Sequence, residues 1–160
     1  MRISREQLYM EMARTASKRS TCHRLNVGAI ITADDRQVST GYNGAAPGEP
    51  HCAGNDCPLS STGGCTRARH AEWNAIDTLP LKFQDGEKFE EELIIYCTHS
   101  PCPSCAENIV RAGIKKVIYE VPYRDSSPVD YLLSKSVTVL RYTPSGYVFD
   151  HSTGKIAGLN

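Results

Sequence analysis

The sequence lacks any long apolar run. None of its apolar stretches approaches the ~20 residues that a transmembrane helix needs. The start of the chain, Met1 to Glu6, also lacks the apolar core of a signal peptide. Both absences predict a cytoplasmic protein with no membrane partner.

The chain also lacks an excess of either charge. Lys plus Arg and Asp plus Glu both number 18, which gives a formal net charge of +0 and a pI near 6.9. Proteins that bind polynucleotides hold the phosphates with clustered Lys and Arg. The charge balance therefore predicts no polynucleotide partner and favours a small-molecule ligand.

No internal repeat, low-complexity segment or linker interrupts the 160 residues. This length suits one ordinary domain with a hydrophobic core of its own. We therefore predict a single domain over residues 1–160, with one active site.

The hydrophobic pattern predicts alternating helices and strands. Ser4 and Gln7 are spaced as a capping box, which predicts that a helix begins at about residue 5. The strand, helix and strand expected over 93–120 indicate an α/β domain with its site at the carboxyl ends of strands. Helices are expected over 5–18, 67–79, 102–112 and 128–134, and strands over 27–33, 37–42, 93–98, 116–120 and 137–141. Residues 82–92 are expected to form a solvated loop, and 147–156 either a small hairpin or a loose tail.

Two short motifs carry the candidate chemistry. Residues 70–72 read His-Ala-Glu, and residues 101–105 read Pro-Cys-Pro-Ser-Cys. Together they match the H-x-E plus P-C-x-x-C signature of zinc-dependent nucleobase deaminases. A catalytic zinc takes three protein ligands and leaves a fourth position open. His70, Cys102 and Cys105 are therefore the expected ligands of a catalytic Zn²⁺.

Glu72 follows the expected ligand His70 by two residues, so it can point at water instead of at the metal. We expect it to act as general base and acid, moving protons from water to the base ring and to departing ammonia. The cysteines also permit a structural zinc knuckle, or a redox pair at C-x-x-C. A structural site made of these ligands would be one ligand short and would have no use for Glu72.

Seven cysteines are present. Because the cytoplasm keeps thiols reduced, they favour metal binding over disulfides. Residues 44–67 form a cysteine-rich insert with almost no apolar residues to bury, and a metal can order such a segment. We therefore predict a second, structural Zn²⁺ held by Cys22, Cys52, Cys57 and Cys65. The alternatives are that some of these are free thiols or that His51 replaces one.

The chain resembles the cytidine deaminase superfamily, and more narrowly the deoxycytidylate deaminases of bacteriophages and bacteria. The similarity covers residues 20 to about 120. Its motifs lie at 20–22, 27–31, 41–48, 51–52, 70–76 and 98–105. The resemblance implies a three-layer α-β-α fold with a five-stranded mixed sheet. It also implies hydrolysis of dCMP to dUMP and ammonia, which would supply dUMP for thymidylate synthesis, with dCTP as a further candidate substrate.

The same resemblance implies a homo-oligomer, with a hexamer favoured. Some members of the family respond to dCTP and dTTP, and Mg²⁺ would accompany a dCTP effector. Residues that would carry such regulation cannot be picked out of this sequence. If the source is a phage, the expected location is the cytoplasm of its host.

For the substrate, the resemblance implies that Asn43 holds the sugar, on a loop flanked by glycines. The alternative is an ordinary Asn at the end of a hairpin. Further expected contacts to the nucleotide are Ala71, His99, Ser100 and Tyr123. Arg24 is the expected phosphate partner on the basis of its charge, with Arg67, Arg69 and Arg124 as rivals.

Two rival functions stay open at the level of sequence. Another deaminase of the same fold could act on tRNA adenosine, guanine or a free nucleoside, because the zinc motif does not name the base. The neutral net charge weakens the tRNA alternative. A non-catalytic zinc module that presents an interaction surface is the rival from a different class, and Glu72 argues against it.

Overall fold

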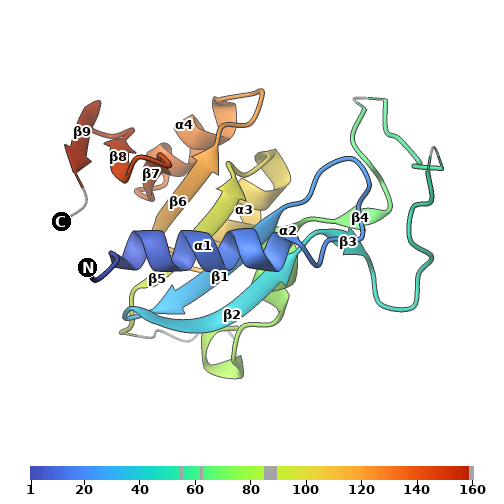
Figure 1. The fold of residues 1–160 in the computed structure, drawn as a ribbon, viewed down its shortest axis with the longest axis horizontal. Coiled ribbons are helices and arrows are strands. Elements are labelled where there is room, and N and C mark those ends of the chain that lie inside the picture. The colour runs from blue at the N-terminus through green and yellow to red at the C-terminus, as the bar shows by residue number, and fades with distance from the viewer. Residues whose placement is uncertain (55, 62, 85–89, 159–160) are drawn as a thin grey trace.

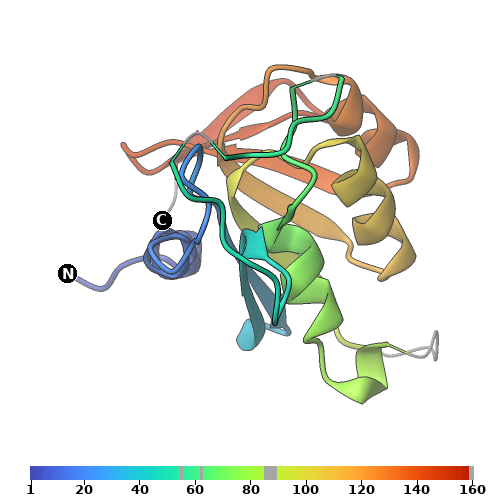
Figure 2. The same ribbon diagram turned by 90° about the vertical axis from the view of Figure 1, so that its right-hand side faces the viewer.

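A seven-stranded mixed sheet forms the centre of the computed structural model, which describes residues 1–54, 56–61, 63–84 and 90–158. Along the sheet, the strands are β2 (Arg36–Tyr42), β1 (Gly28–Ala33), β5 (Leu93–His99), β6 (Lys116–Val121), β7 (Thr138–Tyr142), β8 (Tyr147–Asp150) and β9 (Lys155–Gly158). Helix α1 (Arg5–Ser17) covers one face (Figure 1). Helices α2 (Ala71–Asp77), α3 (Pro103–Arg111) and α4 (Ser127–Ser134) cover the other (Figure 2). The three-layer α-β-α prediction is confirmed.

The sheet has seven strands instead of the expected five, because the C-terminal segment forms a hairpin and joins it. Strand β8 pairs antiparallel with β7, so that Phe149 lies opposite Arg141. The turn after β8 is held to β6, since the Tyr119 hydroxyl lies 2.8 Å from His151 Nε2 and the two rings stack. The loose-tail alternative is therefore wrong.

Strand β5 lies at the middle of two hydrophobic cores. Successive side chains of a strand point to opposite faces of the sheet. Tyr96 accordingly packs with Met10 and Ile118 beneath α1, while Ile95 packs with Val117 beneath the other three helices. Burial on both faces makes β5 a rigid platform, and its carboxyl end is where the candidate site lies.

Several element boundaries differ from the predictions. The Ser4 side chain caps α1 by accepting from the Gln7 amide, as expected. Helix α2, in contrast, begins at Ala71 and not near residue 67, because β4 (Ala68–Arg69) pairs with β3 (Gly44–Ala45). His70 is therefore the N-cap residue of α2. The expected loop after α2 contains the short 3₁₀ helix η1 (Leu81–Phe83) with a buried Phe83, and residues 85–89 of that loop lie outside the described residues.

Helix α2 lies directly on strand β2. A Cβ at Gly41 would stand 2.1 Å from the Ala71 carbonyl oxygen and 2.5 Å from the Ala75 amide nitrogen. Only glycine permits this close approach of two backbones. The contact brings the first turn of α2, with Glu72, up to the edge of the sheet.

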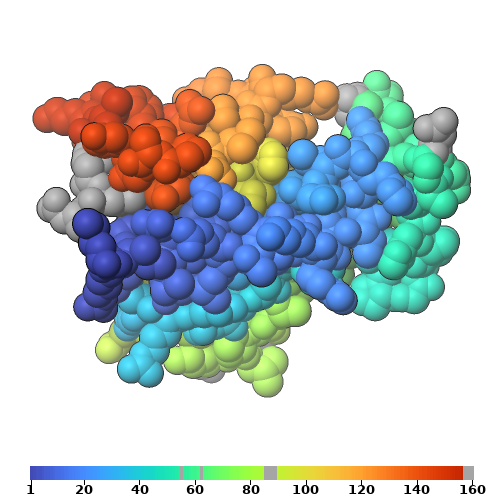
Figure 3. All heavy atoms as spheres, in the orientation of Figure 1, coloured from blue at the N-terminus to red at the C-terminus, as the bar shows by residue number. Residues whose placement is uncertain are grey.

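The cysteine-rich insert forms a lobe at the end of the molecule away from both described termini (Figure 3). Apart from β3, its regular structure as far as described consists of two isolated bridges, Ala53 with Asp56 and Leu59 with Cys65. Within its described residues, Cys52 is the single buried apolar side chain. The insert thus has no hydrophobic core of its own. Across the described parts of the chain, no helix is both long and apolar enough to cross a bilayer.

Candidate active site

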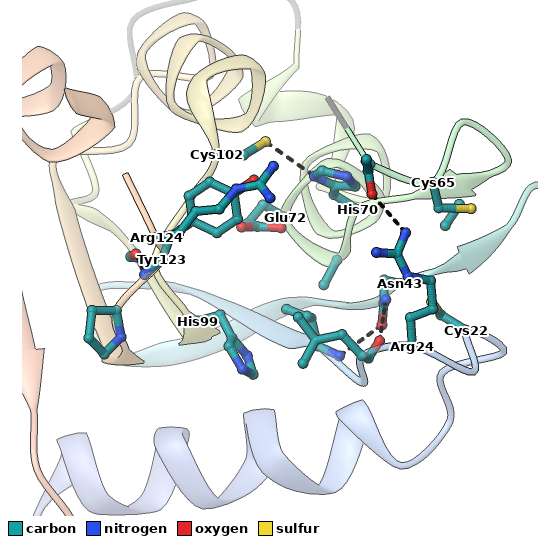
Figure 4. Close-up of a pocket in the computed structure, with 18 residues that line it drawn as sticks. Cys22, Arg24, Asn43, Cys65, His70, Glu72, His99, Cys102, Tyr123 and Arg124 are labelled. Carbon is teal, nitrogen blue, oxygen red and sulfur yellow. Dashed lines mark hydrogen bonds between the residues drawn. The ribbon is translucent and has the colours of Figure 1, made fainter. Parts of the chain in front are cut away.

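The N-termini of α2 and α3 meet at the carboxyl end of β5. His70 is the N-cap residue of α2, Cys102 is the N-cap residue of α3, and Cys105 lies in the first turn of α3. The Nδ1 atom of His70 lies 3.2 Å from the Cys102 sulfur (Figure 4). The same atom lies 3.3 Å from the Cys105 sulfur. Tetrahedral zinc would hold a nitrogen and a sulfur ligand roughly 3.5 Å apart. The three donors therefore fit a zinc ion.

The electrostatics of this cluster favour a thiolate. Hydrogen bonding from the Cys105 thiol, and then from His70 and Ser104, lowers the pKa of Cys102 to about 3. The same hydrogen bond to Cys102, together with burial, raises the pKa of Cys105. The pKa of His70 is raised by its hydrogen bond to Cys102 against the opposing effect of burial. A cluster that already stabilises negative charge on sulfur is suited to a cation.

Glu72 occupies the second position of α2 and is only 4% exposed. Burial, which removes water from the carboxylate, raises its pKa to about 7 against the lowering effect of nearby His70. A group whose pKa is near the working pH can both accept and return a proton. Glu72 therefore has the properties of a general base and acid.

A cavity of about 460 Å³ opens in front of Glu72, which is within the usual size of a small-ligand pocket. It brings together the expected contacts Arg24, Asn43, Ala71, His99, Ser100 and Tyr123 with the donors His70 and Cys102. The expected ligands Cys22 and Cys65 line it as well. Sequence reasoning had not assigned the wall residues Leu25, Val27, Gly63, Gly64, Ala68 and Pro122.

The Asn43 side chain holds one wall of this cavity in place. Its Oδ1 accepts from the Val27 amide at 2.8 Å, and its Nδ2 donates to the Leu25 carbonyl at 2.7 Å. Asn43 is 7% exposed and lines the cavity. One Nδ2 hydrogen remains for a ligand, so the expected contact to the sugar stays a prediction beside this structural role.

The loops after β5 and β6 are tied to each other. The Ser100 amide donates to the Val121 carbonyl at 2.9 Å, and the Ser100 hydroxyl accepts from the Tyr123 amide at 2.6 Å. Next to them, His99 Nδ1 lies 3.0 Å from the Thr98 hydroxyl, and burial lowers the pKa of the His99 ring. The cavity is thus lined here by a neutral imidazole and a fixed loop.

The four arginines considered as partners of the substrate phosphate differ in their surroundings. Arg24 and Arg124 line the cavity, approaching it from opposite sides (Figure 4). Arg69 is paired with Asp77 on α2. Arg67 lies within the insert, with its Nη1 3.8 Å from an Asp56 carboxylate oxygen. Arg24 and Arg124 are therefore the cations positioned for a ligand in this cavity.

Three of the four cysteines predicted for a second zinc come together in the insert. The Cys52 sulfur lies 3.9 Å from the sulfurs of both Cys57 and Cys65. Two cysteine ligands of a tetrahedral zinc are separated by roughly 3.8 Å, so these three fit such an ion. Among the described residues this cluster does not include Cys22, which lines the cavity together with Cys65. Cys22 as the fourth ligand stays a prediction.

Hydrogen bonds between cysteines also shift the pKa values in the insert cluster. A hydrogen bond to Cys65 raises the pKa of Cys57 to about 11. Burial alone would raise the pKa of Cys65, but hydrogen bonds from Cys57 and from the backbone at Ala68 and Arg67 outweigh burial and lower it. The insert therefore also favours a thiolate, at Cys65.

A family model described as "Cytidine and deoxycytidylate deaminase zinc-binding region" matches residues 3–121. The chain belongs to this family. ComE operon protein 2 of Bacillus subtilis (strain 168) is 43% identical over 126 residues, covering 77% of this chain and 62% of that protein. The deoxycytidylate deaminase of Schizosaccharomyces pombe is 34% identical over 152 residues, covering 89% of this chain and 45% of that protein. The chain thus spans less than two thirds of the length of both relatives.

A solved structure of similar size supports the same family. The dCMP deaminase from the cyanophage S-TIM5, crystallised in complex with dCMP and dUMP, aligns with a TM-score of 0.71 and 32% identity. The alignment covers 88% of this chain and 98% of the cyanophage protein. The resemblance to deoxycytidylate deaminases drawn from the motifs is confirmed at the level of the family.

Proposed function

We propose that the protein is a zinc-dependent deaminase that hydrolyses dCMP to dUMP and ammonia. The observation that carries this proposal is the buried carboxyl of Glu72, which faces a nucleotide-sized cavity beside three donors that fit zinc. The names of the fission yeast relative and of the cyanophage structure support dCMP as the substrate. The product dUMP would be available for thymidylate synthesis.

The chain's own residues supply the proton transfers. Zinc held by His70, Cys102 and Cys105 would act as a Lewis acid that lowers the pKa of water. Glu72 takes a proton from the attacking water and delivers it to N3 of cytosine as the new C4–O bond forms. Glu72 then moves the remaining hydroxyl proton to the amino group. The C4–N bond breaks, ammonia leaves and the C4 carbonyl of uracil forms, so that atoms and charge balance.

The remaining contacts have proposed roles in substrate binding. In this proposal the second Nδ2 hydrogen of Asn43 binds the sugar, and Arg24 and Arg124 bind the 5′-phosphate; all three residues line the cavity, which supports these roles. Ala71, His99, Ser100 and Tyr123 would surround the base and the sugar. His99 is neutral in this account, so it contributes a hydrogen bond or a packing surface and no charge.

The proposal includes a second, structural zinc in the insert. Cys52, Cys57 and Cys65 supply three ligands, and Cys22 is the proposed fourth. A closed site of four cysteines suits a structural ion, whose binding free energy contributes to folding. The support from the fold is that the described part of the insert has almost no buried apolar side chain to hold it together.

Two rival activities share the same zinc motif. A tRNA adenosine deaminase would need clustered positive charge to bind RNA, and the net charge of +0 argues against this. A deaminase of guanine or of a free nucleoside would have no use for the two arginines in the cavity. A non-catalytic zinc module would not keep an acid buried beside an open zinc position.

An ammonia-release assay over dCMP, dCTP, CMP, deoxycytidine and adenosine tests the proposal. We expect dCMP to give the highest kcat/KM, and deoxycytidine to be turned over poorly because it lacks the phosphate. Deamination of adenosine without deamination of dCMP would overturn it. Repeating the dCMP assay with dTTP, and with dCTP and Mg²⁺, tests whether these nucleotides regulate turnover. Light scattering tests the expected hexamer.

A further inference from the structure

The cysteine-rich insert and the candidate phosphate site share a wall. Cys65 belongs to the insert cluster and also lines the cavity, as do Gly63 and Gly64 just before it. Arg24 lines the same side of the cavity as Cys65 (Figure 4). We propose that metal binding by the insert cysteines sets the recognition of the 5′-phosphate, because the insert positions Arg24 through the Gly63 carbonyl. This inference rests on the proposed function.

Arg24 has a positive charge that the protein holds in place without neutralising it. Its Nη1 donates to the Gly63 carbonyl oxygen at 2.8 Å. None of the ion pairs formed by the described residues involves Arg24. A guanidinium has five N–H donors, and one bond to a carbonyl leaves the others for a phosphate. The Gly63 carbonyl therefore fixes the direction of the side chain while its charge stays available.

The Gly63 carbonyl is in turn held by the segment that leads into Cys65. The Gly63 amide donates to the Ser60 carbonyl at 2.9 Å, and the Ser60 amide donates to the Gly64 carbonyl at 2.8 Å. Leu59 then forms a bridge to Cys65 itself. The position of the acceptor for Arg24 thus depends on Cys65 and on whatever holds Cys65 in the cluster.

The insert has little else to keep this segment in position. Within its described part, Cys52 is the single buried apolar side chain. A metal bound by the cluster replaces the missing core, so losing it would release Gly63 and let Arg24 swing away. The groups near the base, Glu72 and His99, are carried by α2 and β5 and would stay in place. Loss of the insert metal should therefore weaken binding of the phosphate and spare the nucleoside.

Binding of dCMP and of deoxycytidine, measured by calorimetry in a Glu72→Ala background, tests this coupling without turnover. Arg24→Ala should weaken dCMP binding about 10- to 100-fold, the size of one charge-assisted interaction, and change deoxycytidine binding less than about 2-fold. Arg24→Lys should restore part of the dCMP affinity. Cys57→Ser should lose one zinc per chain and show the same selective loss for dCMP.

The double variant Cys57→Ser/Arg24→Ala should bind dCMP no more weakly than Arg24→Ala alone, because both changes remove the same interaction. Two glycine variants test the link without touching a cysteine. The two positions are matched, because φ is 80° at Gly63 and 85° at Gly48, and a Cβ at either would have no atom within 4 Å. Gly63→Val strains the backbone that orients Arg24 and should weaken dCMP binding selectively. The matched control Gly48→Val, which lies away from the cavity, should not.

Two results would overturn the inference. The first is a Cys57→Ser protein that has lost the second zinc but binds dCMP as tightly as its parent. The second is an equal loss for dCMP and deoxycytidine, which would indicate general damage to the pocket. If Cys57→Ser cannot be purified folded, the two glycine variants provide the test. Gly63→Val binding dCMP as tightly as Gly48→Val would then overturn the inference. If wild-type protein deaminates neither dCMP nor another cytosine nucleotide, the proposed function fails and not the coupling alone.

Discussion

The molecule holds two clusters of side chains that fit a metal ion, and the two are built in opposite ways. The candidate catalytic cluster of His70, Cys102 and Cys105 sits on the N-termini of α2 and α3, at the end of the buried strand β5. The insert cluster sits on loops in a lobe whose described part has almost no core. We propose that in the first cluster a folded scaffold prepares a place for an ion, whereas in the second the ion substitutes for a scaffold.

Because the two clusters are built differently, we expect a metal to have a different role in each. Removing the ion from the catalytic cluster should abolish the chemistry and leave the α-β-α core folded, because the sheet and helices pack without it. Removing the ion from the insert should loosen the insert and leave the proton transfers of Glu72 intact.

The largest effect is expected from Cys105→Ala. The variant should lose the catalytic zinc and with it at least ~10⁴-fold in dCMP turnover, since several kcal/mol of transition-state stabilisation depend on the Lewis acid. Metal analysis should find one zinc per chain fewer than in the wild type. Cys97→Ala is the matched control, because Cys97 is also fully buried but lies outside both clusters. It should keep the full zinc content.

An added methyl group should destabilise the fold more beside helix α2 than in the insert. Gly41→Ala would place a methyl group against the backbone of α2 and should lower the free energy of unfolding by about 2–4 kcal/mol. Gly48→Ala, in the insert, meets no atom within 4 Å and should cost about 1 kcal/mol for its positive φ. Chemical denaturation of both variants makes the comparison. Equal losses of unfolding free energy in the two variants would show that the insert is as tightly packed as the core.

The double variant Cys52→Ser/Cys57→Ser should separate structure from chemistry. It should lose one zinc, be cleaved about 10-fold faster by protease within residues 44–67, and keep the catalytic zinc. Metal analysis shows how many zinc ions remain, and mapping of the cleavage sites shows whether cleavage falls within residues 44–67. A wild-type protein with only one zinc per chain, and insert thiols that react freely with a thiol reagent, would remove the second site from the account.

The smallest effect is expected outside both clusters, at the C-terminal hairpin. Burial, and then the charge of Arg141, lower the pKa of His151 below its ordinary value. The unfolded chain therefore binds this proton first, so the contribution of His151 to stability is complete above about pH 6.5 and is lost as the pH falls. His151→Gln should flatten the decline of Tm between about pH 7 and pH 5. The exposed His23, changed to Gln, is the control and should leave that decline as it is.

The motifs predicted the catalytic cluster because its chemistry dictates its spacing. His70, Cys102 and Cys105 are recognisable in the sequence since three ligands and an acid are needed together, whatever the surrounding fold. The cavity walls could not be predicted in the same way. Gly63 and Gly64 line the cavity only because the insert folds back toward it, and this course of the chain cannot be read from the sequence. The high density of glycine and cysteine in the insert was the signal that could have pointed to this wall.

The fold was predictable where local pattern decides and not where pairing between distant segments decides. The Ser4 cap and the strands flanking α3 follow from residues close in sequence. The late start of α2 depends on the pairing of Ala68–Arg69 with Gly44–Ala45, and the C-terminal hairpin depends on docking against β7. Asn43 was expected to hold a sugar, and its bonds to Val27 and Leu25 became visible only when the chain was folded.

The central claim is that Glu72 moves protons at a zinc site without binding the metal. Parallel measurement of zinc content, dCMP binding and dCMP turnover in Glu72→Ala tests it most directly. The account predicts that the variant keeps the zinc content of the wild type and still binds dCMP, while turnover falls by about 10⁴-fold or more. A variant that retains a tenth of wild-type turnover, or that loses the catalytic zinc, would contradict the claim.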